Sequence, residues 1–260
     1  MEEKAVLVGI NSGIATITLN RPEAMNSLNQ ALTDELVAAL CQVRQDIEVK
    51  VVVLTGNGKA FCAGGDLFYL SSLTSPIAAR NFIAHAGSII TAIMSMDKPV
   101  IAMVNGVAVG AGFNIALACD LVFCAKSVKF AQSFSKVGLV PDCGGFYLLP
   151  RIVGAHKAKE LMFTADSIDA DTALSLRLVN KVVETADLSS VTYQFAERLA
   201  AGAPIALSMI KKLVNRSDTL DLESVLAFEA DLQTICMQTA DYQEGVNAFK
   251  EKRAPLFKGQ

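Results

Sequence analysis

The sequence contains no tryptophan, only two histidines and few charged side chains. Of its 260 residues, 19% are Asp, Glu, Lys or Arg, whereas 52% are hydrophobic. This balance excludes an intrinsically disordered chain, which requires low hydrophobicity and high charge. The formal net charge of −3 argues against a nucleic-acid groove, because such a groove requires clustered Lys and Arg. With His85 and His156 as the only histidines, we predict no metal site and no catalytic triad with a histidine base.

A secretion signal and Cys-x-x-Cys pairs are also missing from the sequence. The chain starts MEEKAVLVGI, with two glutamates before the first apolar run, so we expect a cytoplasmic protein. The cysteines mostly lie within apolar runs, which favours buried free thiols over disulfides. These residues are Cys41, Cys62, Cys119, Cys124, Cys143 and Cys236.

One apolar run, residues 99–119, approaches the length of a membrane span. However, Asn105-Gly106 is a turn signal in the middle of the run, and Asp120 closes it. We therefore interpret the run as a strand, a glycine loop and a buried helix, and we expect no membrane partner.

Short strands alternate with helical segments in the first part of the chain. Two runs with alternating polarity, 5–10 and 14–19, flank the sequence Asn-Ser-Gly, which is typical of a hairpin. Later runs are almost wholly apolar, as expected of strands covered on both faces; they are 50–55, 99–104 and 121–124. The predicted helices around them are 30–47, 77–96 and 111–118. This order predicts an α/β fold with right-handed crossovers and a mostly parallel sheet.

After Gly154 the sequence becomes helical. One short strand candidate, 179–183, interrupts a series of helix-like segments. The predicted helices are 155–164, 168–177, 187–201, 203–216, 220–236 and 239–250. We therefore predict a core of residues 1–200 and a helical subdomain of residues 201–260.

Two glycine turns each follow an apolar strand and precede a helix. The first lies in KAFCAGGDL (59–67), where Asp66 is suited to cap the next helix. The second lies in NGVAVGAGFN (105–114), whose glycines do not complete a dinucleotide-binding fingerprint. If the turns face each other, their backbone N–H groups form an oxyanion hole. The alternative is that the glycines only permit tight turns.

Carboxylates are scarce in the middle of the chain. Between residues 99 and 159 the only ones are Asp120 and Asp142. Asp120 lies between an apolar helix and an apolar strand, which favours a connecting or capping role. Asp142, in VPDCGG, suits either of two roles. It is a base with a raised pKa in an apolar pocket, or it caps a helix that starts near Cys143.

Five segments together resemble the enoyl-CoA hydratase/isomerase family of the crotonase superfamily. They are TLNRPEAMNSLN, FCAGGDL, KPVIAMVNGVAVGAGFNIALACDLVFC, SKVGLVPDCGGFYLLPRIVG and EGVNAFKEKRAPLF. The resemblance implies a stacked β-β-α spiral core, a helical C-terminal trimerisation subdomain and a coenzyme A thioester as substrate. It also implies a homotrimer or dimer of trimers, and an oxyanion hole made by the N–H groups of Gly65 and Ala111.

The chain departs from the family at two positions. Family hydratases carry glutamates where this chain has Asn114 and Phe134, so ordinary hydration is not expected. Asp142 lies where some members carry a working aspartate, and its surroundings look most like the isomerases of phenylacetate breakdown.

Other binding residues are implied only by the resemblance. Around the CoA tunnel they are Arg21, Ala24, Ala63, Gly64, Asp66, Leu67 and Phe68, with Asn114 and Phe134 further in. Phe68 replaces a lysine of the hydratases. Phe249 and Lys252 match the segment that approaches the CoA nucleotide, often in a neighbouring subunit; the alternatives are a packed Phe249 and a solvated Lys252.

These observations predict an acyl-CoA isomerase that shifts a double bond or rearranges a ring, with Asp142 as acid and base and no separate cofactor. The alternatives are residual hydratase activity, an aryl-CoA dehalogenase or hydrolase with Asp142 as nucleophile, and a non-catalytic acyl-CoA-binding protein.

Overall fold

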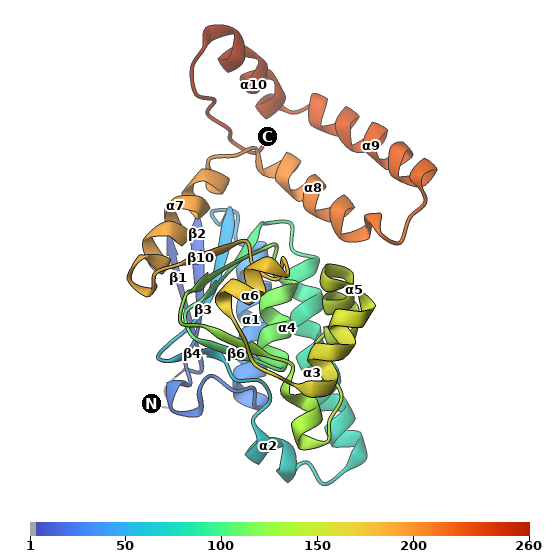
Figure 1. Ribbon diagram of the computed structural model, residues 1–260. Helices are drawn as coiled ribbons and strands as arrows, with labels where there is room; N and C mark the ends of the chain where they lie inside the picture. Colours follow the sequence, from blue (N-terminus) through green and yellow to red (C-terminus); the bar gives the residue numbers. More distant parts are fainter. Residues whose placement is uncertain (1–3) are drawn as a thin grey trace.

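The computed structural model describes residues 4–260, and a six-stranded sheet forms its centre (Figure 1). The strand order is β1-β2-β3-β5-β7-β10. The strands are β1 (Val6–Asn11), β2 (Ile14–Leu19), β3 (Val51–Gly56), β5 (Val100–Val104), β7 (Leu121–Ala125) and β10 (Lys181–Val183). β1 and β2 form an antiparallel hairpin, and the remaining neighbours are parallel. The predicted hairpin and mostly parallel sheet are confirmed.

A second sheet of four short strands was not predicted. Its strands, in spatial order, are β4 (Ala60–Cys62), β6 (Val107–Val109), β8 (Lys129–Ala131) and β9 (Ile168–Asp169). Segments this short show no recognisable hydrophobic period. β4, β6 and β8 each follow a strand of the main sheet along the chain and pair in parallel. The chain thus turns repeatedly from the large sheet to the small one, and the predicted β-β-α spiral is confirmed.

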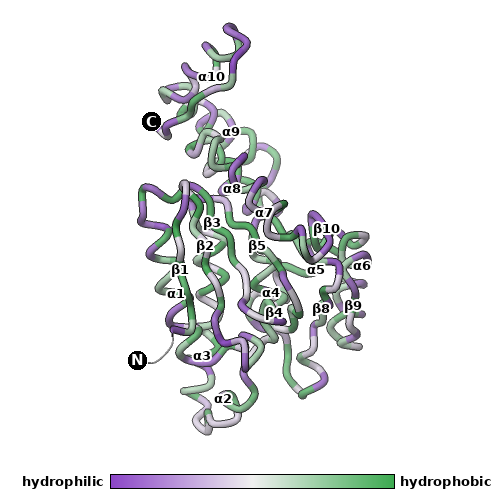
Figure 2. Tube along the Cα trace, turned by 90° about the vertical axis from the view of Figure 1, so that its left-hand side faces the viewer, coloured by the Kyte–Doolittle hydropathy of each residue, from purple (hydrophilic) through white to green (hydrophobic). Residues whose placement is uncertain are grey.

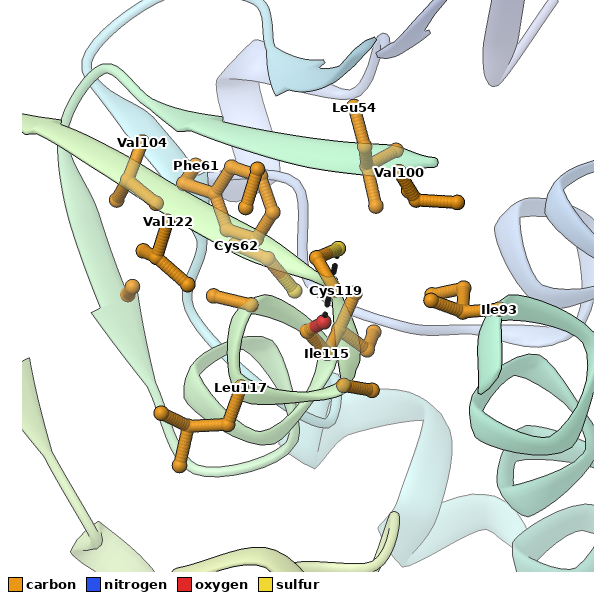
Figure 3. Packing of buried hydrophobic residues seen from close by; sticks show 14 of the residues in the cluster. Leu54, Phe61, Cys62, Ile93, Val100, Val104, Ile115, Leu117, Cys119 and Val122 are labelled. Atoms are coloured by element: carbon orange, nitrogen blue, oxygen red, sulfur yellow. Dashed lines mark hydrogen bonds between the residues drawn. The ribbon is translucent and has the colours of Figure 1, made fainter. Parts of the chain in front are cut away.

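Helices cover these sheets and fill the space between the turns. They are η1 (Pro22–Ala24), α1 (Gln30–Gln45), α2 (Leu67–Ser72), α3 (Pro76–Met94), α4 (Ala111–Ala118), η2 (Ser133–Val137), α5 (Gly145–Thr164), α6 (Ala170–Ser175), η3 (Thr185–Asp187) and α7 (Leu188–Ala200). Every residue of α4 is buried. Figure 3 shows Cys62 of β4 pointing toward α4, the helix that carries Ile115 and Leu117. α4 is therefore a central element of the core.

The helix predicted after Gly154 starts earlier in the structure. α5 begins at Gly145 and continues to Thr164, with non-helical backbone only at Gly154 (φ 77°, ψ 160°). Pro150 and Gly154 obscured its first half in the sequence, because both residues are signals for a helix end.

Three C-terminal helices lie beyond the sheets (Figures 1 and 2). They are α8 (Pro204–Ser217), α9 (Leu222–Met237) and α10 (Ala240–Glu251). No residue of α9 is buried, and Leu222, Leu226 and Ile235 are exposed. Exposed apolar side chains in such numbers are typical of an interaction surface. The helical nature of this subdomain is confirmed, while its boundary at residue 200 stays a prediction.

The cysteine prediction is correct in part. Cys62, Cys119, Cys124 and Cys143 are buried free thiols. Cys41 is exposed and Cys236 is half-buried, so the expected burial is wrong for these two. Cys41 directly follows Leu40 on α1 and lies outside the buried stripe of that helix.

The apolar run 99–119 forms β5, β6 and α4 inside the fold, as predicted. Among the described residues, α3 alone passes a length and composition test for a membrane-crossing helix. Its residues Phe82, Ala86, Ile89, Ile90 and Ile93 are buried in the protein.

Candidate active site

The two glycine turns lie against each other. A Cβ atom on Gly64 would lie 2.9 Å from the carbonyl oxygen of Val109 and 3.6 Å from the nitrogen of Ala111. Gly64 and Gly110 both have positive φ values, 95° and 54°, so each also needs the backbone freedom of glycine. The turns after β4 and β6 are therefore adjoining parts of one site.

Each turn carries at least one backbone N–H group for which no partner is found within residues 4–260. Around Gly65, the amide of Leu28 donates to Gly64 O and the amide of Asp66 donates to Leu28 O. Around Ala111, the amide of Gly110 donates to Ala131 O. The amides of Gly65 and Ala111 make no such bond.

Ala111 is the first residue of α4, so its amide has no acceptor within that helix and lies at the positive end of the helix dipole. Together the amides of Gly65 and Ala111 supply two unused donors on adjoining turns, which is what an oxyanion hole requires. Their assignment to this role stays a prediction.

Asp142 lies in a tight turn just before α5. Its carbonyl oxygen accepts a hydrogen bond from the amide of Gly145 at 2.9 Å, and Cys143 and Gly144 both have positive φ values. α5 begins at Gly145 with Gly144 as its N-cap residue. The alternative in which Asp142 caps a helix starting near Cys143 is therefore wrong, and its side chain is left free for another purpose.

The carboxylate of Asp142 is poorly solvated. Its Oδ1 atom is buried and has no hydrogen-bond partner among the described residues. Burial raises the pKa of Asp142 above its usual range, and a hydrogen bond from Cys143 opposes this only in part. A carboxyl group of this kind is suited to accept and return a proton, because a raised pKa makes its ionised form a stronger base than an ordinary carboxylate.

Cys62 links the carboxylate to the glycine turns. Burial raises the pKa of the Cys62 thiol to about 12; a hydrogen bond to Gly64 lowers it and the charge of Asp142 raises it further. Since Cys62 ends β4, just before the first glycine turn, Asp142 lies close enough to this turn for its charge to be felt there. The structure thus brings the predicted base and the two free amides into one region.

The positions that hold glutamates in family hydratases carry no charge here. Asn114 is fully buried; its side-chain amide donates to Asp142 O at 2.8 Å and accepts from Gln132 at 2.7 Å. Phe134 is buried in η2, and its ring atoms lie 3.5–3.6 Å from the place of a Cβ on Gly110. An aromatic ring therefore covers the second glycine turn.

Several residues predicted to bind CoA gather beside the first turn. Arg21 pairs with Asp66 at 3.2 Å and also donates to Ser27 O. Asp66 caps α2 by accepting from the amides of Phe68 and Tyr69, as the sequence predicted. These contacts hold the N-terminal loop against the turn.

The other residues predicted to contact CoA here lie within the first glycine turn, beside it in the N-terminal loop, or on the exposed start of the helix that follows it. Ala63 donates its amide to Met25 O in the loop that contains Ala24. Leu67 and Phe68 are exposed, Phe68 to 91%.

Phe249 and Lys252 lie elsewhere. Phe249 is on α10 and is 86% exposed, and Lys252 is the exposed C-cap residue of the same helix. α10 and α2 lie at opposite ends of the molecule (Figure 1). The alternative of a packed Phe249 is wrong for this chain, and a contact with the CoA of a neighbouring subunit stays a prediction.

Asp120 has the structural role that the sequence favoured. Its Oδ2 atom accepts from the amide of Val100 at 2.7 Å and pairs with Lys211 at 2.7 Å. Burial raises the pKa of Asp120, and the nearby Lys211 lowers it. Asp120 thus joins α8 to the edge of β5 and leaves Asp142 as the carboxylate free for chemistry.

Comparisons with known proteins agree with this geometry. The family model described as "Enoyl-CoA hydratase/isomerase" matches residues 9–260. The 1,2-epoxyphenylacetyl-CoA isomerase of Escherichia coli strain K12 is 38% identical to this chain, and the matched region covers 98% of both proteins. The short-chain-enoyl-CoA hydratase of Clostridium acetobutylicum is 37% identical to this chain, and the matched region covers 97% of both proteins. The crystal structure of an enoyl-CoA hydratase from Bacillus anthracis superposes with a TM-score of 0.95 at 34% identity, covering 98% of this chain and 100% of that one.

The chain therefore belongs to the enoyl-CoA hydratase/isomerase family of the crotonase superfamily. An acyl-CoA thioester as substrate is consistent with this membership. Both isomerases and hydratases occur among its relatives, so the choice between these reactions depends on the residues of this chain.

Proposed function

We propose that this protein is an acyl-CoA isomerase in which Asp142 moves a proton between two carbon atoms of the bound thioester. The single observation that carries the proposal is the buried Oδ1 atom of Asp142, which has no hydrogen-bond partner among the described residues, in a site where the buried residues Asn114 and Phe134 stand at the positions that the family resemblance assigns to the two hydratase glutamates. One carboxylate suffices for a proton shift, whereas hydration needs a base for water and an acid for the α-carbon.

The reaction conserves atoms and electrons. In a 3-enoyl thioester, a carboxylate oxygen of Asp142 takes a proton from C2, and the electron pair of the C–H bond moves into an enolate. The amides of Gly65 and Ala111 stabilise the oxygen of this enolate. Asp142 then donates a proton to C4, either the one it took up or one exchanged with solvent, and the double bond lies between C2 and C3.

The aromatic ring of Phe134 favours this outcome over hydration. It fills the place of a water-binding carboxylate and covers Gly110. A drier pocket suppresses addition of water and keeps the pKa of Asp142 high. The name of the E. coli relative favours a ring-containing substrate, and we extend the proposal to ring rearrangement on that ground.

Three further assignments belong to the same proposal. The protein works without a separate cofactor, because CoA is part of the substrate. It is a cytoplasmic homotrimer or dimer of trimers, supported by the exposed apolar side chains of α9. In that assembly Phe249 and Lys252 approach the CoA of a neighbouring subunit.

Deuterated buffer separates the candidate reactions in one experiment. The wild-type protein is incubated with 2-hexenoyl-CoA, 3-hexenoyl-CoA, phenylacetyl-CoA and 4-chlorobenzoyl-CoA, and the products are analysed by mass spectrometry. We expect 3-hexenoyl-CoA to isomerise with deuterium at C2 or C4 and without addition of water.

Other products would contradict the proposal. Water addition to 2-hexenoyl-CoA without isomerisation of 3-hexenoyl-CoA indicates a hydratase. Loss of chloride indicates a dehalogenase, and tight binding without any turnover indicates an acyl-CoA-binding protein.

A further inference from the structure

A buried pair of side-chain amides connects α4 to the turn that holds Asp142. Gln132, at the end of β8, donates from Nε2 to Oδ1 of Asn114 at 2.7 Å. Asn114 in turn donates from Nδ2 to the carbonyl oxygen of Asp142 at 2.8 Å. Both amide residues are at most 1% exposed. Both polar ends of Asn114 are therefore engaged within the protein.

Asn114 also connects the helix that presents the Ala111 amide to the turn that holds Asp142. It lies one helical turn after Ala111 on α4, and α4 is packed on β4 at Gly112, where a Cβ atom would lie 2.1 Å from Cys62 O. The helix that presents the Ala111 amide is therefore rigidly placed. The hydrogen bond from Asn114 fixes the Asp142 turn relative to this helix.

The surroundings of Asn114 leave room for this amide and little else. A Cβ atom on Gly145 would lie 2.6 Å from Nδ2 of Asn114, so Gly145 is needed for the contact. The Asp142 carbonyl accepts from both Asn114 and the Gly145 amide. These two donors to one oxygen hold the turn in a single conformation.

A carboxylate at position 114 is incompatible with this arrangement. It can accept from Gln132, but it has no hydrogen to donate to Asp142 O, so two acceptor oxygens would face each other at hydrogen-bond distance. Its negative charge would also lie against the backbone of Asp142 and make ionisation of this residue harder. In this chain an acidic residue at 114 is therefore expected to disturb the turn of Asp142 and to disfavour its ionised form.

We infer that Asn114, supported by Gln132, is a positioning residue that holds Asp142 in place for proton transfer and keeps negative charge away from it. This inference rests on the proposed function of Asp142. It gives the loss of the hydratase glutamate at position 114 a role of its own in the isomerase reaction.

The test compares the pH dependence of deuterium exchange into 3-hexenoyl-CoA for three variants of the site. Asn114→Asp is expected to lower kcat about 10- to 100-fold, as for an unsatisfied buried acceptor. The midpoint of the acidic limb of its pH profile is expected to shift to higher pH by about one unit or more. Asn114→Leu is expected to lower kcat similarly without raising this limb. Gln132→Leu is expected to lower kcat less, about 3- to 10-fold.

Asn20 provides a matched control, because its buried amide makes the same two kinds of contact. It donates to Lys4 O at 2.9 Å and accepts from the side chain of Asn57 at 2.8 Å. Asn20→Asp is expected to lower stability but to leave the pH profile unchanged. KM for 3-hexenoyl-CoA is expected to change less than kcat in all Asn114 variants, because Asn114 has no polar atom left for the substrate.

Two outcomes would overturn the inference. If folded Asn114→Asp keeps the wild-type pH profile while Asp142→Asn abolishes exchange, Asn114 does not position the base, and the proposed function survives. If Asp142→Asn exchanges deuterium at the wild-type rate, the proposed function fails and this inference fails with it. Circular dichroism establishes which variants are folded.

Discussion

Replacement of Asp142 by asparagine is expected to reduce deuterium exchange at C2 of 3-hexenoyl-CoA by about 100- to 10,000-fold, the usual contribution of a general base. Asparagine has nearly the same shape as aspartate but cannot take up a proton. The titratable side chains that act on Asp142 are the thiols of Cys62 and Cys143, and burial raises the pKa of both, so they stay protonated and are poor substitutes for the base. The measurement is single-turnover exchange followed by mass spectrometry.

The Asp142→Asn variant is expected to remain folded, and this distinguishes a chemical defect from a structural one. Burial raises the pKa of Asp142, so the folded protein holds this proton more tightly than the unfolded chain does. The contribution of the Asp142 carboxyl group to the free energy of unfolding is therefore fully present at low pH. It is lost as the pH rises through the raised pKa of the folded state. At pH 7 the neutral asparagine should therefore be at least as stable as the ionised aspartate, which thermal unfolding at pH 7 tests. Wild-type exchange rates in the variant would exclude Asp142 as the base.

The same pKa shift predicts the pH dependence of the wild-type enzyme. Only ionised Asp142 accepts a proton, and its raised pKa keeps it protonated at pH values where an ordinary carboxyl is ionised. We expect kcat/KM to fall with decreasing pH along a limb whose midpoint lies above the ordinary value for an aspartate. A midpoint at or below the ordinary aspartate value would contradict a desolvated base.

The main sheet could be predicted because its strands are long enough to show a pattern. Runs such as 50–55 and 99–104 are almost wholly apolar, and the structure buries every residue of the corresponding strands β3 and β5. The second sheet escaped prediction because two- and three-residue strands such as β6 and β9 obtain their conformation from neighbouring strands rather than from their own sequence.

The candidate site could be predicted only in part from the sequence. The glycine turns and Asp142 are marked by residue type and by their place after apolar strands. The role of Gln132 left no signal, since a single polar residue at a strand end is normally solvated, whereas here it is 1% exposed and bonded to Asn114. The proximity of residues far apart in sequence, such as Cys62 and Asp142, whose charge raises the pKa of the Cys62 thiol, depends on how the spiral stacks its turns.

Gly112 is the position where a single methyl group is expected to damage the oxyanion hole most. The Cβ atom of an alanine there would lie 2.1 Å from Cys62 O and 2.6 Å from Cys62 Cβ. These atoms belong to the end of β4 in the core, so they cannot move aside as an exposed side chain does. The start of α4 must instead shift away from the first glycine turn, and the amide of Ala111 shifts with it.

The Gly112→Ala variant is therefore expected to lose about 100- to 1,000-fold in kcat for the exchange reaction, the contribution of one oxyanion donor. Gly87→Ala is the matched control, because Gly87 lies in α3 and a Cβ there would meet nothing within 4 Å. That variant should keep full activity and gain about 0.5–1 kcal/mol in the free energy of unfolding, as expected for alanine in a helix interior. Displacement of the Ala111 amide should weaken its hydrogen bond to the enolate oxygen more than its hydrogen bond to the carbonyl oxygen of the bound substrate. If Gly112→Ala folds and retains the wild-type kcat, the amide of Ala111 therefore does not stabilise the enolate.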